Sequence, residues 1–304
     1  MSAFRAGPVT VAVPATSANL GPGFDCLGLA LDLHDRLTGE VVDSGLEIEV
    51  VGEGEDVLPR DERHLVVRAM RVAFARAGAN PPGLRLRFEN RIPQSRGLGS
   101  SSAAIVGGLA LARALLADGD DLLSLAEVLV LANELEGHPD NVAPALFGGF
   151  VVCGQDDDDV WADQAPIAPS VRAVVFVPPE GVSTEAARGL LPAQVPHAVA
   201  AANAGRAALL VAALGSAPHR LHRATEDFLH QEFRASAMPA SYELVSSLRA
   251  AGHAAVISGA GPTVLVLTAS AGDADLDALL AEAPAGWACA VRDVDHTGVR
   301  VVAS

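Results

Sequence analysis

Hydrophobic and polar positions alternate strictly in several short stretches of the first half of the chain. In "VTVAV", Val9, Val11 and Val13 share one face, which predicts a strand that stops at Pro14. "LEIEVVG" and "LRLRFEN" alternate in the same way and predict two further strands. Residues 64–78, in contrast, have apolar positions at helical spacing and end in glycine, a typical helix stop. Strands and helices without a regular βαβ repeat indicate an α+β arrangement.

A second group of elements follows the acidic run Asp156–Asp159, which we expect to be a solvated loop. The domain boundary is placed beside it, giving domains of residues 1–160 and 161–304. "VRAVVFVPP" predicts a strand, and "AAVISGAGPTVLVLT" with "ACAVRDVDHTGVRVV" completes a second α/β sandwich. Helices are expected at Glu185–Leu191, Ala198–Leu214, Leu221–Phe228 and Ser241–Ala251.

Composition narrows the chemistry. Half of the residues are apolar and the net charge is −16, which argues against nucleic-acid and anionic-membrane partners. All 21 basic residues are arginines, because the sequence contains no lysine. A Walker-type phosphate loop, a Schiff-base lysine and a protein-kinase lysine are therefore excluded. Any phosphate chemistry must use backbone amides, a metal ion and arginine.

The cysteines and the apolar stretches predict a cytoplasmic protein. Cys26, Cys153 and Cys289 are isolated in the sequence, which disfavours a zinc site or a disulfide framework and suits a reducing compartment. No signal-peptide core is expected near the N-terminus. The longest apolar stretches contain Arg113 and Arg206, so neither is expected to span a membrane.

A glycine-serine string, "RGLGSSSAA" at Arg96–Ala104, opens onto the apolar run Ile105–Leu116. Glycine allows backbone amides to approach a ligand, and a helix start offers unpaired N–H groups to an anion. The segment therefore favours a phosphate cradle, with an ordinary serine cap after a glycine turn as the alternative. Two further glycine-rich segments, Pro14–Leu31 and Ser258–Leu267, are each consistent with a tight turn when taken alone.

Taken in order, the three segments resemble the motifs of the GHMP kinases, at Pro14–Phe24, Pro93–Ala103 and Gly259–Thr263. "NELEGHPDNVAPALFGGFVV", "VSTEAARGLLP" and "EFRASAMPASYELV" extend the resemblance to the homoserine kinase branch, over about residues 9–302. The resemblance implies a two-domain GHMP kinase fold: an N-terminal domain like ribosomal protein S5 domain 2 and a ferredoxin-like C-terminal α/β sandwich. It also implies ATP between the domains, phosphorylation of the L-homoserine hydroxyl in threonine biosynthesis, and allows a homodimer.

The resemblance assigns ATP contacts to the glycine-serine loop and two residues outside it: Pro93, Gln94, Ser95, Arg96, Gly97, Leu98, Gly99, Ser100, Ser101, Ser102, Ala103, His64 and Thr184. His64 stands where related kinases often carry asparagine near the adenine, and a histidine still donates or accepts a hydrogen bond there. Mg²⁺ is assigned to Ser101 and Glu134. The link Leu135–Gly137 before the next motif is short, so the choice of glutamate stays open.

Homoserine is a zwitterion, so its site needs a cation for the carboxylate and an anion or carbonyls for the ammonium. The resemblance assigns this pocket to Asn19, Asp25, His138, Asp140, Asn141, Arg188, Arg234 and Gly261. The two arginines suit the carboxylate, and Asp25 or Asp140 the ammonium. Asn141, Asp140 and Arg188 are the candidate catalytic residues. Because an amide cannot take a proton, direct transfer with late proton loss is favoured over Asp140 as a base.

Three alternatives stand beside this interpretation. A sister kinase for another alcohol, such as mevalonate or shikimate, would share the loop, and the ammonium side of the pocket distinguishes it. A non-catalytic GHMP-fold sensor would be expected to have lost the phosphate loop or the metal glutamate. A serine hydrolase is disfavoured because no G-x-S-x-G elbow is present.

Overall fold

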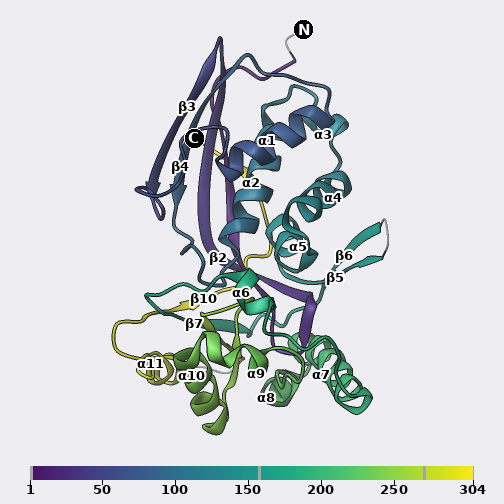
Figure 1. Cartoon of the computed structure of the whole chain (residues 1–304), viewed down its shortest axis with the longest axis vertical. Coiled ribbons are helices and arrows are strands. Elements are labelled where there is room, and N and C mark those ends of the chain that lie inside the picture. The colour runs from purple at the N-terminus through teal and green to yellow at the C-terminus, as the bar shows by residue number, and fades with distance from the viewer. Residues whose placement is uncertain (1–2, 157–158, 270–271, 304) are drawn as a thin grey trace.

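A computed structural model describes residues 3–156, 159–269 and 272–303, and in this part of the chain the strands form two separate sheets (Figure 1). The larger sheet has seven strands in the order β11-β1-β2-β4-β3, and β5 pairs with both β2 and β6. Its strands are β1 Val9–Asn19, β2 Gly23–Val42, β3 Gly45–Gly52, β4 Gly83–Asn90, β5 Phe150–Asp156, β6 Asp159–Ala165 and β11 Arg300–Val302.

Helices gather on one side of this sheet, with α2 at their centre (Figure 1). They are α1 Leu65–Arg76, α2 Ser100–Leu115, α3 Gly119–Leu122, α4 Leu125–Glu136 and α5 Pro139–Phe147. α2 is buried against the sheet and α1 through apolar residues such as Val106 and Leu109. Gly108 is required at the crossing, since a Cβ there would lie 2.6 Å from the carbonyl oxygen of Val66. This packing fixes the N-terminal end of α2.

The second sheet has four antiparallel strands in the order β10-β7-β9-β8. These are β7 Arg172–Val177, β8 Ala254–Ile257, β9 Val264–Thr268 and β10 Ala288–Arg292. The helices around it are α6 Thr184–Arg188, α7 His197–Gly215, α8 Leu221–Ala224, α9 Gln231–Arg234, α10 Pro239–Ala250 and α11 Asp273–Leu280, with short 3₁₀ turns at Pro218–Arg220 and Ala235–Ala237. The observed architecture is the expected α+β class.

Two expectations about the strands are corrected. β1 does not stop at Pro14 but continues to Asn19, and its pairing with β2 shifts register between Pro14 and Ala15. A proline has no N–H for the ladder, and the irregularity accommodates it. The expected boundary at residue 160 falls inside the β5–β6 hairpin, and β11 pairs with β1 in the first sheet instead of joining the second. Residues 157–158 of the acidic run lie outside the described residues.

α7 is, within the ranges described above, the one helix long and apolar enough to cross a membrane by length and composition alone. Two of its polar side chains are engaged inside the fold: Asn203 donates to the carbonyl of Pro22 at 2.7 Å, and Arg206 donates to Glu226 at 2.6 Å. These contacts are those of a helix in a folded domain.

The turn between β1 and β2 docks into the C-terminal half of the molecule. A Cβ on Gly21, whose φ is +87°, would lie 2.6 Å from the carbonyl oxygen of Thr225. The carbonyl of Gly21 accepts a hydrogen bond from His230, and Asn19 donates to the carbonyl of Gly259. The hairpin therefore brings N-terminal residues against α9 and the β8–β9 loop, and a cleft forms between the two halves.

Candidate active site

The glycine-serine loop presents a free helix start at this cleft. Gly99 caps α2 with a left-handed φ of 69°, and no side chain caps the helix. A Cβ on Gly99 would lie 2.0 Å from Thr16 Oγ1, and one on Gly97 would lie 2.3 Å from the carbonyl oxygen of Ser258. Only glycine fits both positions, and the ordinary serine cap is excluded. Unpaired backbone amides at a helix start are a general anion-binding feature, and α2 presents such a start here.

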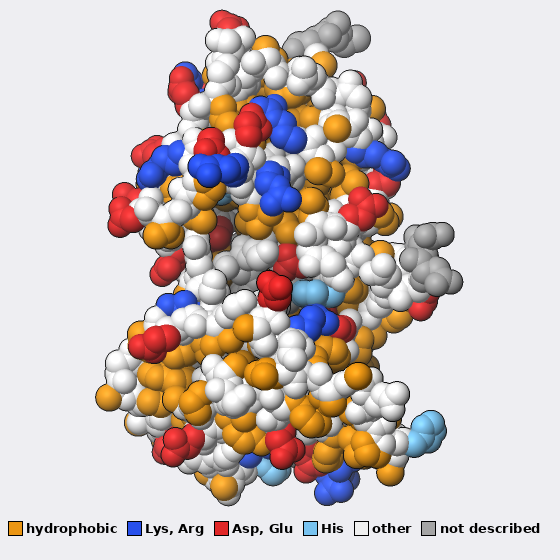
Figure 2. All heavy atoms as spheres, in the orientation of Figure 1, with side chains coloured by type: hydrophobic (Ala, Val, Ile, Leu, Met, Phe, Trp, Pro, Cys, Tyr) orange, Lys and Arg blue, Asp and Glu red, His pale blue; other side chains and the backbone are white. Residues whose placement is uncertain are grey.

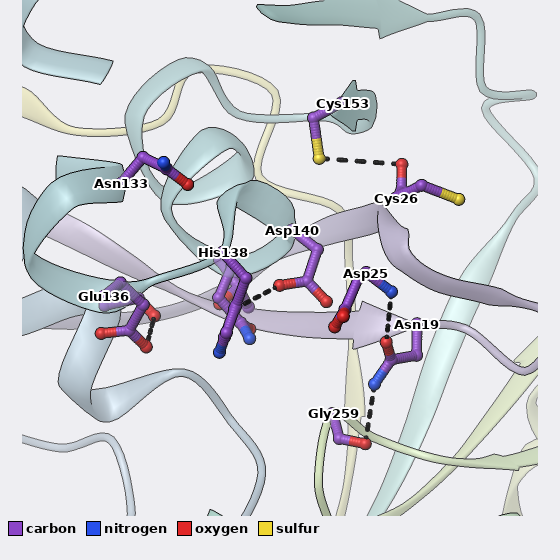
Figure 3. A network of polar contacts seen from close by, with 12 residues as sticks. Asn19, Asp25, Cys26, Asn133, Glu136, His138, Asp140, Cys153 and Gly259 are labelled. Carbon is purple, nitrogen blue, oxygen red and sulfur yellow. Dashed lines mark hydrogen bonds and ion pairs between the residues drawn. The ribbon is translucent and has the colours of Figure 1, made fainter. Parts of the chain in front are cut away.

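The glutamate beside this helix start is Glu136 and not Glu134, to which the resemblance assigned Mg²⁺. Ser101 Oγ donates to Glu136 Oε2 at 2.9 Å and Ser102 Oγ donates to Oε1 at 2.8 Å, whereas Glu134 is exposed. Residues two apart on a helix are separated by about 200° around its axis, so only one of the two glutamates can face the loop. Figure 3 shows Glu136 on the same side of the site as His138.

A cavity of about 150 Å³ lies directly in front of the loop. Its lining comes from both halves of the molecule, and Figure 2 shows acidic, basic and histidine side chains gathered on the surface between those halves. The lining residues are Asn19, Asp25, Ser95, Gly97, Gly99, Ser100, Ser101, Glu136, His138, Asp140, Asn141, Thr184, Arg188, Arg234, Gly259 and Ala260. Seven of the eight residues expected to bind substrate are therefore brought together around one cavity.

Asp25 is held in an unusual backbone conformation and is paired with Arg188. Its φ is +57°, and its N–H donates to Asn19 Oδ1 at 3.0 Å (Figure 3). Both guanidinium nitrogens Nη1 and Nη2 of Arg188 donate to the Asp25 carboxylate, at 2.9 and 2.8 Å. This pairing raises the pKa of Arg188. The contact joins β2 to α6 across the cleft.

Arg234 differs from Arg188 because it has no acidic partner within ion-pair distance in the described structure. Only 2% of the residue is exposed, and its Nε has no hydrogen-bond partner among the described residues. Burial lowers the pKa of Arg234, and the nearby charge of Arg188 lowers it further. A buried cation without an anion is a site prepared for an anionic ligand group.

α5 supplies a second polar cluster. His138 Nδ1 lies 2.8 Å from Asp140 Oδ1, a contact that raises the pKa of His138 (Figure 3). Asn141 Oδ1 accepts the hydroxyl of Thr16 at 2.9 Å. Thr16 is a residue that the sequence analysis did not single out, although it lies inside the first glycine-rich segment. Thr16 lies against the glycine-serine loop at Gly99 and against the α5 cluster at Asn141.

A second cavity, of about 170 Å³, adjoins the first and shares Ser95, Ser100 and Ser101 with it. His64 lies in its wall, 3% exposed, with its ring 4.7 Å from that of Phe88. His64 Nδ1 accepts the N–H of Val66, so the ring carries its proton on Nε2, which is buried and has no partner within the described ranges. Desolvation lowers the pKa of His64 to about 4, so the ring is neutral at pH 7.

Other expected residues lie beneath or beside the cavities. Arg96 donates to the carbonyls of Gln94, Pro178 and Pro179, so it links the loop to the C-terminal half. Gly261 is not among the residues that line the cavity, and a Cβ there would lie 2.4 Å from Met238 Sδ. Gln94 lines the His64 cavity. Leu98, Ser102 and Ala103 are buried behind the loop, and Pro93 is half-buried.

Comparisons with known proteins agree with this arrangement. The GHMP kinase N-terminal domain matches residues 64–149 and the GHMP kinase C-terminal domain matches residues 200–284. Homoserine kinase from Streptomyces avermitilis is 55% identical over 99% of this chain and 97% of its own length. The one from Corynebacterium urealyticum is 48% identical over 86% of each.

Solved structures give the same answer. Homoserine kinase from Cytophaga hutchinsonii superimposes with a TM-score of 0.85 at 27% identity, covering 97% of both chains. Putative homoserine kinase from Listeria monocytogenes superimposes with a TM-score of 0.77 at 31% identity, covering 97% of this chain and 99% of that one. The chain therefore belongs to the homoserine kinase family of the GHMP kinases.

Proposed function

We propose that the protein is an ATP-dependent kinase that phosphorylates the side-chain hydroxyl of L-homoserine to O-phospho-L-homoserine, a step of threonine biosynthesis. The observation that carries the proposal is the cavity in front of α2, which holds one paired arginine, one unpaired buried arginine and an aspartate. This charge set complements a zwitterionic amino acid. Mevalonate and shikimate have no ammonium group and would leave Asp25 without a ligand partner.

The phosphate loop and the His64 cavity together form the ATP site in this proposal. The amides at the start of α2 receive the phosphates, and the adjoining cavity receives the base. The Nε2–H of His64 donates to a ring nitrogen of adenine, which satisfies its unpartnered atom. Ser95, Ser100 and Ser101 lie between the two cavities, where the phosphate chain must cross.

The donors around Glu136 fit Mg²⁺. Within the described ranges, no cluster of three or more His, Cys, Asp or Glu could hold a metal ion. Mg²⁺ typically uses one or two carboxylates together with substrate phosphates and water, and Glu136 with Ser101 supplies hard oxygen donors next to the phosphate loop. Bound there, Mg²⁺ would neutralise charge on the phosphates.

The amino-acid part of the cavity orients the substrate. Arg234, together with Arg188, binds the carboxylate, and Asp25 binds the ammonium. The hydroxyl end then lies toward Asn141 and the start of α2. Positioning of this kind, with electrostatic stabilisation by the helix start, supplies most of what phosphoryl transfer needs.

Among the described residues that line the cavity, we propose that none acts as a general base. Asn141 is an amide that already accepts a hydrogen bond from the Thr16 hydroxyl. Asp140 is 1% exposed and is hydrogen-bonded to His138. We therefore propose direct transfer, in which the hydroxyl proton leaves late, to phosphate or solvent. We also propose a cytoplasmic location, in keeping with three free cysteines, and no nucleic-acid partner, in keeping with a net charge of −16.

The test is ADP release with Mg·ATP against L-homoserine, D-homoserine, L-serine, L-threonine, mevalonate and shikimate. Strong preference for L-homoserine, with phosphate on its side-chain oxygen, supports the proposal. Preference for another alcohol would keep the loop assignment and overturn the pocket roles of Asp25, Arg188 and Arg234. ATP binding without turnover of any alcohol would support a sensor.

A further inference from the structure

His230, at the start of α9, has a ring whose two nitrogens bind two different parts of the site. The residue is 1% exposed. Its Nε2 lies 2.8 Å from the carbonyl oxygen of Gly21, and its Nδ1 lies 3.3 Å from Arg234 Nη1. A carbonyl only accepts, so Nε2 carries the proton, and Nδ1 is left as a lone pair that accepts from the guanidinium. The two contacts define one neutral tautomer.

The backbone of His230 is fixed independently of its ring. Asp227 Oδ2 accepts the N–H groups of His230 and Gln231 at 3.1 and 2.7 Å, and Asp227 Oδ1 accepts that of Leu229 at 3.0 Å. The ring of Phe24 lies 5.3 Å from the His230 ring on the side of the hairpin. The imidazole is therefore held between the docked hairpin and α9.

Phe24 also touches both arginines. The guanidinium carbon of Arg234 lies 5.3 Å from the centre of the Phe24 ring, and that of Arg188 lies 5.4 Å from it. The face of an aromatic ring attracts each guanidinium cation electrostatically and leaves its positive charge in place. The arginines differ in their polar partner, since Arg188 is neutralised by a carboxylate and Arg234 is bound by an uncharged imidazole.

We infer that His230 is a positioning residue for substrate recognition: its Nδ1 lone pair holds the Arg234 guanidinium in the cavity while leaving the full positive charge available to the substrate carboxylate. A carboxylate in this place would hold Arg234 equally well but would neutralise it. The same ring ties the arginine to the Gly21 carbonyl, so hairpin docking and carboxylate recognition share one side chain. The inference rests on the proposed function in that Arg234 receives the substrate carboxylate.

The surroundings keep His230 neutral. The charged groups that face it are Asp227 from the preceding loop, Arg234 from α9 and Asp25 from β2. Burial and the charge of Arg234 lower the pKa of His230 and outweigh the opposing effect of Asp227. A proton on Nδ1 would replace an attractive contact with Arg234 by repulsion between two cations.

Two substitutions separate the two ring contacts. In His230→Asn, the side-chain oxygen stands where Nδ1 stood, so it can accept from Arg234 but cannot reach Gly21. In His230→Gln, the amide nitrogen stands where Nε2 stood, so it can donate to Gly21 but leaves Arg234 without its acceptor. Each variant keeps one contact and loses one, which matches them in the number of polar contacts that are lost.

Steady-state kinetics with both substrates varied then tests the inference. His230→Asn is expected to keep the KM for L-homoserine within about threefold, and His230→Gln to raise it about tenfold or more, for the loss of one hydrogen bond to a charged group. The KM for ATP should change little in either variant. Equal effects on the two variants, or a larger effect in His230→Asn, would make His230 a structural tie for the hairpin and overturn the inference.

A measurement that needs neither turnover nor a variant at His230 covers variants that fail to fold. Histidine ¹⁵N NMR of the wild-type protein should show an Nε2–H tautomer for His230, with an Nδ1 resonance that moves when Arg234→Leu removes the donor. A protonated Nδ1, or a resonance that does not respond to Arg234→Leu, overturns the inference. Failure of the proposed function is separately visible, as absence of wild-type activity on L-homoserine.

Discussion

Arg188 and Asp25 form an ion pair with two parallel hydrogen bonds, of 2.9 and 2.8 Å, across the cleft between the two halves of the molecule. Arg234, which lies over the same Phe24 ring, has no such partner in the part of the chain described. The two arginines are therefore not equivalent. In the proposed mode of binding, the substrate carboxylate meets the uncompensated positive charge of Arg234, and the substrate ammonium meets Asp25, whose carboxylate is already oriented by Arg188.

Arg234→Leu is expected to raise the KM for L-homoserine by about tenfold or more and to change the KM for ATP by less than about twofold, because a charge-assisted bond to the carboxylate is lost. Initial rates with each substrate varied measure this. Arg63→Leu, at an exposed arginine paired with Asp61, is the matched control. Equal losses in both KM values would place Arg234 in the fold and not in the pocket.

Asp25→Asn tests recognition of the ammonium group. We expect kcat/KM for L-homoserine to fall by about tenfold or more, because a carboxylate facing an ammonium is lost. With 4-hydroxybutyrate, which is homoserine without its amine, the variant and the wild type should have similar kcat/KM values. The measurement is the ratio of kcat/KM for L-homoserine to kcat/KM for 4-hydroxybutyrate, compared between the variant and the wild type. A parallel fall for both alcohols would show that Asp25 acts by orienting Arg188.

Glu136→Gln and Glu134→Gln form a pair that differs only in position on α4. Glu136 accepts from Ser101 and Ser102, and Glu134 is exposed. Loss of the Glu136 charge should lower kcat at least about a hundredfold and raise the Mg²⁺ concentration needed for half-maximal rate, since a hard anionic ligand is removed. Glu134→Gln should remain within about twofold of wild type. Similar Mg²⁺ titrations for the two variants would contradict the assignment.

Much of the fold and of the candidate site could be predicted from the sequence, because these parts depend on the local pattern of apolar and polar residues. The alternation of Leu84, Leu86 and Phe88 predicts the strand that is observed as β4. The apolar run after Gly99 predicts the helix that is observed as α2, with its free N-terminus. The choice between Glu134 and Glu136 could not be predicted. It depends on how the last turn of α4 is rotated, and Gly137, with a φ of 92°, ends that helix immediately afterwards.

Long-range pairing was the other limit of prediction. The sequence of β11 contains no local pattern that predicts pairing with β1. The pairing depends on the free edge that β1 offers at Val11, which lies far away in the sequence. Thr16 lay in a recognised segment, yet its role follows from two contacts, with Gly99 and Asn141, that are distant in sequence. His230 has no motif at all. Its importance arises because a hairpin from the N-terminal half reaches α9.

Gly99→Ala tests the phosphate loop against a control with the same backbone. Gly99 and Gly78 have φ values of 69° and 66°, so a side chain is strained at both, at about 1–2 kcal/mol. No atom of the described residues lies within 4 Å of a Cβ at Gly78, whereas a Cβ at Gly99 would meet Thr16 Oγ1. Gly99→Ala should therefore lower stability more and raise the KM for ATP by about tenfold or more. If Gly99→Ala and Gly78→Ala have the same free energy of unfolding in urea and the same KM for ATP, the shape of the loop does not determine phosphate binding.

The buried neutral ring of His64 predicts a pH dependence of stability. Its pKa is lowered to about 4 by desolvation, against about 6.5 in the unfolded chain. Below pH 6.5 the unfolded state takes up a proton that the folded state refuses, so the stability that His64 contributes is complete above pH 6.5 and is lost toward pH 4. By pH 5 the loss is about 2 kcal/mol.

His64→Asn isolates this effect, because asparagine is also a good helix cap and can accept the N–H of Val66. Asp35, in the same cavity, has a pKa raised by burial to about 6 and works in the opposite direction, but it is present in both proteins. The wild type's advantage in free energy of unfolding should therefore shrink by about 2 kcal/mol between pH 7.5 and pH 5. Urea unfolding at both pH values measures it, with His197→Asn, at an exposed histidine, as the control. A constant difference between wild type and His64→Asn would mean that His64 binds a proton equally well folded and unfolded, and that its Nε2 reaches water.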